Sequence, residues 1–336
     1  MYFKTLIAAA MALVAATAAR AADISGAGAT FPFPIYAKWA DAYKKETSNG
    51  LNYQSIGSGA GVKQIRAKTV TFGATDAPLE AKDLDKDGLA QWPMVMGGIV
   101  MVVNLPGVKA AELVLDGPTI AQIYMGKITK WNDPAIKALN PNLSLPDLAI
   151  ANIHRADGSG TTFNFTYYLS QVSPEWQSAI GTATTVEWPS GIGAKGNDGV
   201  ANNVATTPGA IGYVEFAYAK QNKLTFTSMI NKAGKTVAPT MDAFQAAAAN
   251  ADWSVPGFYQ ILANQPGDAS WPMTAATFIL MYKQPANVAA SNDALAFFKW
   301  AYEKGGKMAQ DLDYIPMPDN VAKLVEAMWA KDVEQK

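Results

Sequence analysis

Apolar residues along this chain gather in short runs and helical stripes that alternate from residue 51 onward. Strands are predicted at residues 52–56, 70–75, 98–104, 148–154, 211–216 and 278–282. Helices with one apolar face are predicted at residues 62–68, 119–125, 293–304 and 321–331. The run at 99–103 is apolar throughout, as expected of a strand covered on both faces. The pattern predicts an α/β fold in which mostly parallel central sheets are flanked by helices.

The first 21 residues have a different pattern. Lys4 precedes an apolar run at residues 6–18, and the small-residue triplet Ala19-Arg20-Ala21 follows. This order is typical of a secretory signal peptide cleaved after Ala21. The alternative is a transmembrane anchor, but the run is shorter than the ~20 residues that a membrane-spanning helix needs. We therefore expect an exported protein without a membrane anchor.

Composition narrows the possible chemistry. The chain has no cysteine, and His154 is its single histidine, which argues against thiol catalysis and against thiolate or histidine-rich metal sites. We expect no metal and no cofactor. A formal net charge of −1 without basic runs disfavours nucleic acid as a partner, whereas small anions can still bind to local dipoles. The length of 336 residues suggests two domains, at about 150 residues per domain.

Three Gly-rich turns that open into predicted helices carry the candidate chemistry. They are GAGATFP from Gly26, GSGAG from Gly57 and RADGSGTT from Arg155. Each offers backbone N–H groups, a hydroxyl and the positive end of a helix dipole, a combination that binds tetrahedral oxyanions. The third turn also brings the Arg155 guanidinium, whose planar fork suits two contacts with one oxyanion.

A single turn of this kind is a weak signal, because such turns commonly serve only as tight turns with a hydroxyl cap. Arg155 alone also suits a surface ion pair, and Asp157 suits either a helix cap or a carboxylate that orients the guanidinium. Neither the dinucleotide-binding spacing nor the nucleotide P-loop ending is present. Three turns in one chain, two early and one past the middle, favour an oxyanion held between domains.

Longer motifs contain or accompany these turns. They are GAGATFP from Gly26, YQSIGSGAG from Tyr53, FGATDAPL from Phe72, RADGSGT from Arg155, GAIGYVE from Gly209, LDG from Leu115, IYMGKITKW from Ile123, GNDG from Gly196 and DLDY from Asp311. Together they resemble the periplasmic phosphate-binding proteins of phosphate ABC importers, in order along essentially the whole exported chain. The resemblance implies a periplasmic protein in which two α/β domains close over phosphate like a clamp.

The resemblance also implies a ligand set when it is carried over position by position. The implied phosphate ligands are Thr30, Phe31, Ser58, Asp76, Arg155, Ser159, Gly160 and Thr161. Side-chain hydroxyls, backbone N–H groups and the guanidinium would donate hydrogen bonds, and Asp157 would hold Arg155 without touching phosphate. Two departures from the family pattern, Ser55 before Ile56 and Gly-Ala-Gly after Ser58, touch no implied ligand atom.

Asp76 is the implied ligand that would select phosphate. Without the resemblance, an aspartate between a predicted strand and Ala77-Pro78 is typical of a turn residue. A carboxylate in an anion site repels its ligand unless the ligand carries a hydrogen, because an ionised carboxylate only accepts hydrogen bonds. Phosphate has such a hydrogen near neutral pH and sulfate has none. Asp76 therefore predicts a preference for phosphate over sulfate.

Other functions remain open at this point. Arsenate, phosphonate and phosphite also carry a hydrogen and suit the same site, whereas molybdate, like sulfate, is disfavoured. An exported phosphatase would need an activated nucleophile or paired metals, and the chain offers neither, so we expect no enzyme. A surface adhesin would be expected to lack these intact motifs.

The resemblance implies a domain arrangement and a partner. We expect a signal peptide at residues 1–21, a first domain made of residues 22–104 and 272–336, and a second domain at 105–271. The expected crossings lie near Leu105-Pro106 and Trp271-Pro272. The implied partner is a membrane permease with its cytoplasmic ATPase, to which a monomer would deliver inorganic phosphate.

Overall fold

The computed structural model describes residues 24–333, so the predicted signal peptide lies outside the described residues. The strands are β1 (Ile24–Gly28), β2 (Leu51–Ser55), β3 (Phe72–Thr75), β4 (Leu89–Val103), β5 (Val114–Leu115), β6 (Ala151–Arg155), β7 (Ile192–Ala194), β8 (Ala210–Glu215), β9 (Thr225–Phe226), β10 (Ser228–Ile230), β11 (Thr236–Val237), β12 (Thr274–Tyr282) and β13 (Ile315–Pro316). The helices are α1 (Phe33–Thr47), α2 (Ser58–Arg66), α3 (Ala81–Asp87), α4 (Gly117–Tyr124), α5 (Pro134–Leu139), α6 (Gly160–Val172), α7 (Pro174–Ala179), α8 (Gly196–Thr206), α9 (Phe216–Gln221), α10 (Met241–Ala248), α11 (Val288–Lys304), α12 (Gly306–Gln310) and α13 (Asp319–Asp332).

The main sheet runs in the order β2-β1-β3-β12-β4-β8-β6-β7, with β13 and β9 also paired to β4. Its two ends are parallel: β1 pairs with β2 and β3, and β6 pairs with β7 and β8. The central pairs that involve β12 and β4 are antiparallel. The predicted α/β fold is thus confirmed, and its parallel strands lie toward the two ends of the sheet.

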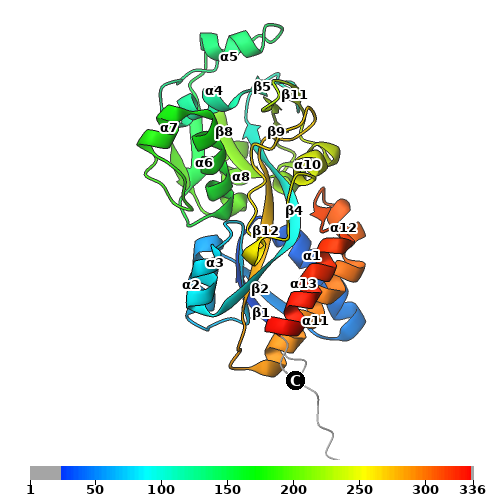
Figure 1. Ribbon diagram of the computed structural model, residues 1–336. Helices are drawn as coiled ribbons and strands as arrows, with labels where there is room; N and C mark the ends of the chain where they lie inside the picture. Colours follow the sequence, from blue (N-terminus) through cyan, green and yellow to red (C-terminus); the bar gives the residue numbers. More distant parts are fainter. Residues whose placement is uncertain (1–23, 334–336) are drawn as a thin grey trace, which may run out of the picture.

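Strand β4 joins two lobes. Its residues 89–98 pair with β12 on one side, and its residues 99–103 pair with β8 on the other. Figure 1 shows the result as two groups of elements, one above the other, with β4 and β12 between them. We call the group of β1–β3, α1–α3 and α11–α13 the first lobe, and the group of β5–β11 and α4–α10 the second lobe. The predicted domain boundaries stay a prediction, and the change of partners within β4 favours a crossing nearer Gly98.

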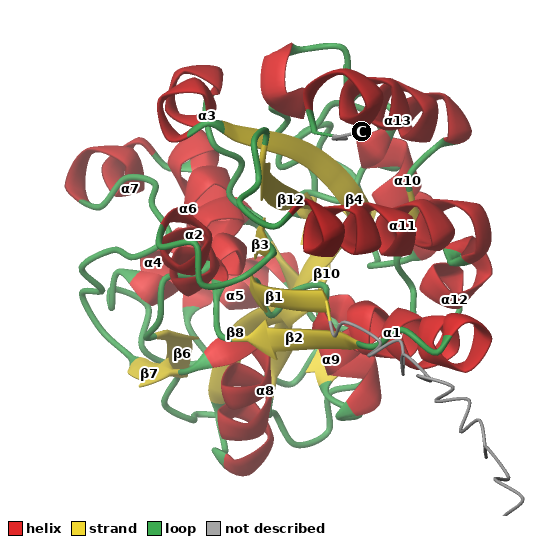
Figure 2. Cartoon of the chain, turned by 90° about the horizontal axis from the view of Figure 1, so that it is seen from below, coloured by secondary structure: helices red, strands yellow, loops and turns green. Residues whose placement is uncertain are grey.

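The first lobe covers its sheet on both faces. Figure 2 shows α2 and α3 on one side of β1–β3, and α1 and α11–α13 on the other. Helix α1 begins with a proline-containing first turn and buries Ile35, Tyr36, Trp39 and Tyr43. This stripe matches the 3.6-residue period of a helix that packs on one face.

Strand β4 is longer than the sequence predicted, since it begins at Leu89 rather than at residue 98. Pro93 argues against a central strand, because proline lacks the N–H that a ladder needs. In the structure Pro93 pairs with Phe278, where the ladder of β12 carries a register shift between Thr277 and Phe278. Such an irregularity lets a strand tolerate proline.

Each lobe has its own aromatic packing. Trp92 lies edge-on to Phe298 at 5.7 Å and to Trp329 at 5.3 Å in the first lobe. Phe165 stacks on Tyr213 at 4.1 Å in the second lobe. These buried rings pack α11 and α13 against β4, and α6 against β8. Among residues 24–333, no helix is long and apolar enough to cross a membrane.

Candidate functional site

The predicted ligands lie where strands of the two lobes end. Thr30 and Phe31 follow β1, Ser58 begins α2 after β2, and Asp76 follows β3. From the second lobe, Arg155 ends β6, and Ser159, Gly160 and Thr161 stand at the start of α6. Ligands of open α/β sheets typically bind outside the carboxyl ends of parallel strands. The side chains of Thr30, Ser58, Asp76, Arg155, Ser159 and Thr161 are buried there.

The two lobes touch directly at this place. The Gly59 amide donates to the carbonyl of Gly158 at 2.9 Å. The Asn164 side chain donates to the carbonyl of Asp76 at 2.7 Å. A β-carbon added at Gly160 would lie only 2.6 Å from the β-carbon of Asp76, so this approach requires glycine. The structure therefore shows the lobes closed on one another.

Asn197, at the start of α8, joins two predicted ligands. Its side-chain amide donates to Thr30 Oγ1 at 2.7 Å and to Thr161 Oγ1 at 3.1 Å. Thr30 Oγ1 also accepts from the Asn197 backbone amide at 3.1 Å, and Thr161 Oγ1 from Arg155 Nη1 at 3.4 Å. Both threonine oxygens are thus occupied as acceptors, and each retains its own hydrogen to donate.

The hydroxyl oxygens of Ser58 and Ser159 also accept hydrogen bonds, as those of the two threonines do. Ser58 Oγ accepts from the amides of Gly160 at 3.0 Å and Asp76 at 3.2 Å. Ser159 Oγ caps α6 by accepting from the amide of Thr162 at 3.0 Å. Each serine therefore keeps a hydrogen to donate, as the two threonines do. The Gly160 amide differs from the expectation, because it donates to Ser58 in this structure.

Asp157 fixes the guanidinium of Arg155. Arg155 Nε lies 2.7 Å from Asp157 Oδ1, and Nη2 lies 2.5 Å from Oδ2. Asp157 also accepts from the amide of Gly196 at 3.0 Å. Burial acts to raise the pKa of Asp157, but the hydrogen bonds and charge of Arg155 outweigh it and lower that pKa. This pair holds one edge of the guanidinium and leaves the remaining N–H groups of Nη1 and Nη2 for a ligand.

Asp76 is a buried carboxyl group without a hydrogen bond. Within the described residues, neither of its side-chain oxygens has a hydrogen-bond partner. Burial raises its pKa from 3.8 to about 7, while the charge of Arg155 and the nearby hydroxyls of Thr277 and Ser58 pull it down. A buried acceptor of this kind is costly unless a ligand completes it. The arrangement suits a ligand that donates a hydrogen bond.

Thr277 of β12 lies beside Asp76. Phe278 pairs with Thr75, so Thr277 faces the end of β3 where Asp76 follows. On the other side of β12, the pairing with β4 shifts by one residue at this point, because Met94 of β4 lies between the partners of Thr277 and Phe278. Irregularities of this kind often re-aim side chains next to functional sites. The Thr277 hydroxyl is buried and, like the Asp76 carboxyl, has no partner in the described part of the chain.

The structure adds residues that the sequence analysis did not assign. Besides Asn197, the hydroxyl of Tyr218 donates to the carbonyl of Thr30 at 2.7 Å. Glu215 and Tyr314 lie in contact beside Phe31. Asn197, Glu215 and Tyr314 belong to the motifs GNDG, GAIGYVE and DLDY, which indicate the family but not the roles of these three residues.

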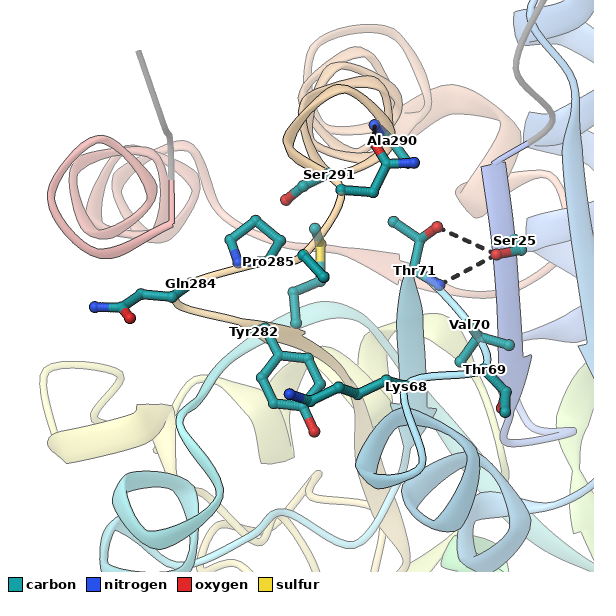
Figure 3. Close-up of a pocket in the computed structure, with 13 residues that line it drawn as sticks. Ser25, Lys68, Thr69, Val70, Thr71, Tyr282, Gln284, Pro285, Ala290 and Ser291 are labelled. Atoms are coloured by element: carbon teal, nitrogen blue, oxygen red, sulfur yellow. Dashed lines mark hydrogen bonds between the residues drawn. The ribbon is translucent and has the colours of Figure 1, made fainter.

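Other features that could carry chemistry do not belong to the predicted ligand set. Figure 3 shows a cavity of about 290 Å³ lined by residues such as Ser25, Lys68 and Ser291, and none of the predicted ligands lines it. It lies at the amino ends of β1 and β3, opposite the candidate site. His154 stacks on Trp188 at 4.7 Å. Residues 24–333 contain no group of three or more potential metal ligands.

Known proteins share both the sequence and the fold. The PBP superfamily domain matches residues 13–304. Proteins named phosphate-binding protein PstS match from Pasteurella multocida (52% identity, 94% of this chain and 92% of that protein) and Haemophilus influenzae (51%, 94% and 95%). The chain belongs to this phosphate-binding protein family. A relative with the same name from Methanocaldococcus jannaschii is 34% identical over 88% of this chain and 83% of its own length.

Solved structures extend the likeness in fold. A phosphate-binding protein from Stenotrophomonas maltophilia superposes with a TM-score of 0.69 at 19% identity, over 92% of this chain and 94% of that one. A putative phosphate ABC transporter substrate-binding protein from Clostridium perfringens, solved with bound phosphate, gives 0.63 at 19% identity, over 88% and 100%. At such identities the likeness concerns the two-lobed α/β fold.

Proposed function

We propose that this protein captures inorganic phosphate between its two lobes and delivers it to an ABC-type phosphate importer. The observation that carries the proposal is the buried, unpartnered carboxyl group of Asp76, which lies among hydrogen-bond donors. Donors alone would suit any oxyanion. A carboxylate among them suits an oxyanion that has a hydrogen of its own to donate.

The proposed ligands divide into donors and one acceptor. The donors are the hydroxyls of Thr30, Ser58, Ser159 and Thr161, the backbone N–H groups of Phe31, Gly160 and Thr161, and the Arg155 guanidinium. Four phosphate oxygens can accept all of these hydrogen bonds, while the phosphate hydrogen goes to Asp76. Sulfate would place an unprotonated oxygen against the carboxylate, and the repulsion in a buried site would reject it.

The single hydrogen of the Gly160 amide can be donated either to Ser58 Oγ or to the proposed phosphate ligand. In the structure it donates to Ser58 Oγ, whereas the proposed ligand set directs it to phosphate. We propose that a small shift of the α6 N-terminus on binding exchanges one acceptor for the other. The exchange would free Ser58 Oγ to rotate its own hydrogen toward the ligand.

The relatives support this function. Proteins half identical to this chain are named phosphate-binding proteins, and one solved protein of the same fold holds bound phosphate. A protein exported by the predicted signal peptide would work as a monomer in the periplasm and pass its ligand to a permease and its cytoplasmic ATPase. Arsenate, which has the shape and the hydrogen of phosphate, is the competing ligand. Turnover of a phosphate ester would instead indicate a phosphatase.

Equilibrium binding tests the proposal. Titration of the purified exported chain with phosphate, arsenate and sulfate between pH 5 and pH 9, followed by tryptophan fluorescence, should give tight binding of phosphate and no measurable binding of sulfate. A chromogenic phosphate ester should remain uncleaved. Equal affinity for sulfate and phosphate would contradict the proposed role of Asp76, and absence of phosphate binding would contradict the function itself.

A further inference from the structure

Glu215 is a buried glutamate that the proposed phosphate site does not use. It ends β8 in the second lobe, and its side chain is 0% exposed, the one buried glutamate among the described residues. Its Oε2 atom accepts from the amide of Ala217 at 2.9 Å and lies 2.7 Å from the hydroxyl of Tyr314. Its Oε1 atom has no hydrogen-bond partner within residues 24–333.

Tyr314 links this carboxyl group to a proposed phosphate ligand. Its hydroxyl lies 2.6 Å from the carbonyl oxygen of Phe31 as well as 2.7 Å from Glu215 Oε2. The Phe31 ring also packs edge-on against the Tyr314 ring at 6.0 Å. Phe31 stands in the turn between β1 and α1, whose backbone N–H is proposed to bind phosphate. The three oxygens therefore form a chain from the second lobe to the phosphate-binding turn of the first.

The three oxygens of Glu215, Tyr314 and Phe31 need two hydrogens for their two contacts. A phenol hydroxyl has one hydrogen, a backbone carbonyl only accepts, and an ionised carboxylate only accepts. Both oxygen–oxygen distances are those of hydrogen bonds. If Glu215 were ionised, one of the two contacts would bring two lone pairs together in a buried place. A second hydrogen is needed, and of these three groups Glu215 is the one that can supply it.

We propose that Glu215 is protonated in the closed protein and that its O–H donates a hydrogen bond to the hydroxyl oxygen of Tyr314. The Tyr314 O–H can then donate a hydrogen bond to the carbonyl of Phe31. Glu215 is then a positioning residue: from the second lobe it fixes the turn that presents the Phe31 amide. The inference rests on the proposed function for its consequence, but the protonation state itself follows from the three oxygens and their distances.

The surroundings of Glu215 favour the neutral acid. Burial raises its pKa well above the ordinary value and outweighs the Tyr314 hydroxyl and the Ala217 amide, which lower it, while the charge of Asp313 adds a smaller rise. No ion pair involves Glu215 within the described chain. The nearby cation of Lys220 pairs instead with Asp313 at 3.5 Å.

The other faces of Glu215 present neutral groups. Its backbone amide donates to the side-chain oxygen of Asn197 from α8. Tyr218 from α9 directs its hydroxyl to the carbonyl of Thr30. Gly97 of β4 lies against the unpartnered Oε1 atom, where an added β-carbon would come within 3.3 Å. None of these neighbouring groups carries a positive charge that would stabilise the ionised form of Glu215 at neutral pH.

A loss of this proton would change the turn. An ionised Glu215 would accept the hydrogen bond of the Tyr314 hydroxyl, and the Phe31 carbonyl would lose its donor. The Phe31 turn would then be less firmly held when phosphate binds. We therefore expect phosphate affinity to fall at alkaline pH, where Glu215 ionises, and to do so beyond any effect of the phosphate ionisation itself.

The test reads the protonation state directly. The protein is labelled with ¹³C at the glutamate carboxyl carbon, saturated with phosphate, and studied by infrared or NMR spectroscopy at pH 7. We expect one protonated glutamate signal, because the exposed glutamates are ionised, and Glu215→Gln should remove it. A spectrum in which every glutamate is ionised at pH 7 would overturn the proposal, and it needs no variant to fold.

A second measurement tests the link to binding. Tyr314→Phe removes the connecting hydroxyl and should weaken phosphate binding ~10-fold, the effect of one buried hydrogen bond, with a flatter alkaline limb of the pH profile. Tyr282→Phe, which removes a partly exposed hydroxyl at the far end of β12, is the matched control. Wild-type affinity and pH profile in Tyr314→Phe would overturn the positioning role. Calorimetry of the wild type reports separately whether phosphate binds at all.

Discussion

The side-chain amide of Asn197 donates to Thr30 Oγ1 at 2.7 Å, across 167 positions of sequence. Thr30 belongs to the first lobe and Asn197 to the second. The second hydrogen of the same amide goes to Thr161. One side chain therefore sets the direction of two hydroxyls, and it does so only when the lobes are closed. This hydrogen bond couples lobe closure to the orientation of the proposed phosphate donors.

Asn197→Ala should weaken phosphate binding by about 2–4 kcal/mol, because two buried hydroxyl oxygens lose the donor that orients them. Calorimetry measures the change in affinity. Asn202→Ala, at an exposed position of the same helix α8, is the control and should bind as wild type. Unchanged affinity in Asn197→Ala would show that the threonine hydroxyls need no such support.

Asp76→Asn should narrow the preference for phosphate over sulfate sharply. The asparagine amide can donate to an unprotonated sulfate oxygen, which the carboxylate repels. Competition titrations with both anions measure the ratio of affinities. Asp242→Asn removes an exposed carboxylate from α10 and controls for the change in net charge. A ratio equal to that of the wild type would remove Asp76 from its proposed role.

Arg155→Ala should weaken phosphate binding by a few kcal/mol, since a charge-assisted contact in a buried site is lost. Arg155→Lys keeps the charge but loses the planar fork and its pairing with Asp157, so it should recover only part of the affinity. Calorimetry on both variants separates charge from geometry. Arg66→Ala, at a partly exposed ion pair with Asp87, should leave binding intact.

Much of the fold could be predicted from the apolar pattern. Helix α13 and strand β8 lie within two residues of their predicted bounds, because a helical stripe and a buried strand leave clear periods. Helix α11 begins earlier than predicted, at Val288, where Asn287 caps it by accepting from the amide of Ala290. The sequence does not predict the extra length of β4, because Pro93 is typical of a strand breaker and the irregularity beside it, at Met94, is visible only in the paired strands.

The candidate site could be assembled from motifs, but not its internal hydrogen bonds. The Gly-rich turns and Arg155 indicated an oxyanion, and the family resemblance supplied Asp76. The roles of Asn197 and Tyr314 depend on contacts between residues far apart in sequence, across the lobes. No local period encodes such contacts. They arise from the topology of β4 and β12, which brings the two lobes face to face.

The pKa of Asp76 makes the stability of the phosphate-free protein depend on pH. Its folded pKa of about 7 exceeds the ordinary value of 3.8, so the folded state holds more protons than the unfolded state between these values. Stability should therefore fall as pH rises from 4 to 7, with the full penalty above pH 7. At pH 8 the unfolding free energy of Asp76→Asn should exceed that of the wild type by at most about 4 kcal/mol, which denaturant titration measures. At pH 4 the two proteins should be equally stable. Equal stability at pH 8 would mean that Asp76 is hydrated before phosphate binds.

Gly160→Ala should prevent the lobes from closing. The added β-carbon would lie 2.6 Å from both the Asp76 β-carbon and Ser58 Oγ and 2.7 Å from the Asp76 amide nitrogen, and the backbone atoms there cannot move aside cheaply. We expect phosphate binding to weaken roughly ten- to a hundredfold, and small-angle scattering should show no compaction when phosphate is added. Gly199→Ala, where the new carbon meets its neighbours at 3.6 Å or more within α8, is the matched control and should close normally. Because the lobes are closed in the structure, phosphate-free Gly160→Ala should also unfold at a lower denaturant concentration than the wild type, since it loses the contact between the lobes. An unfolding free energy equal to that of the wild type would instead indicate that the lobes are open before phosphate binds.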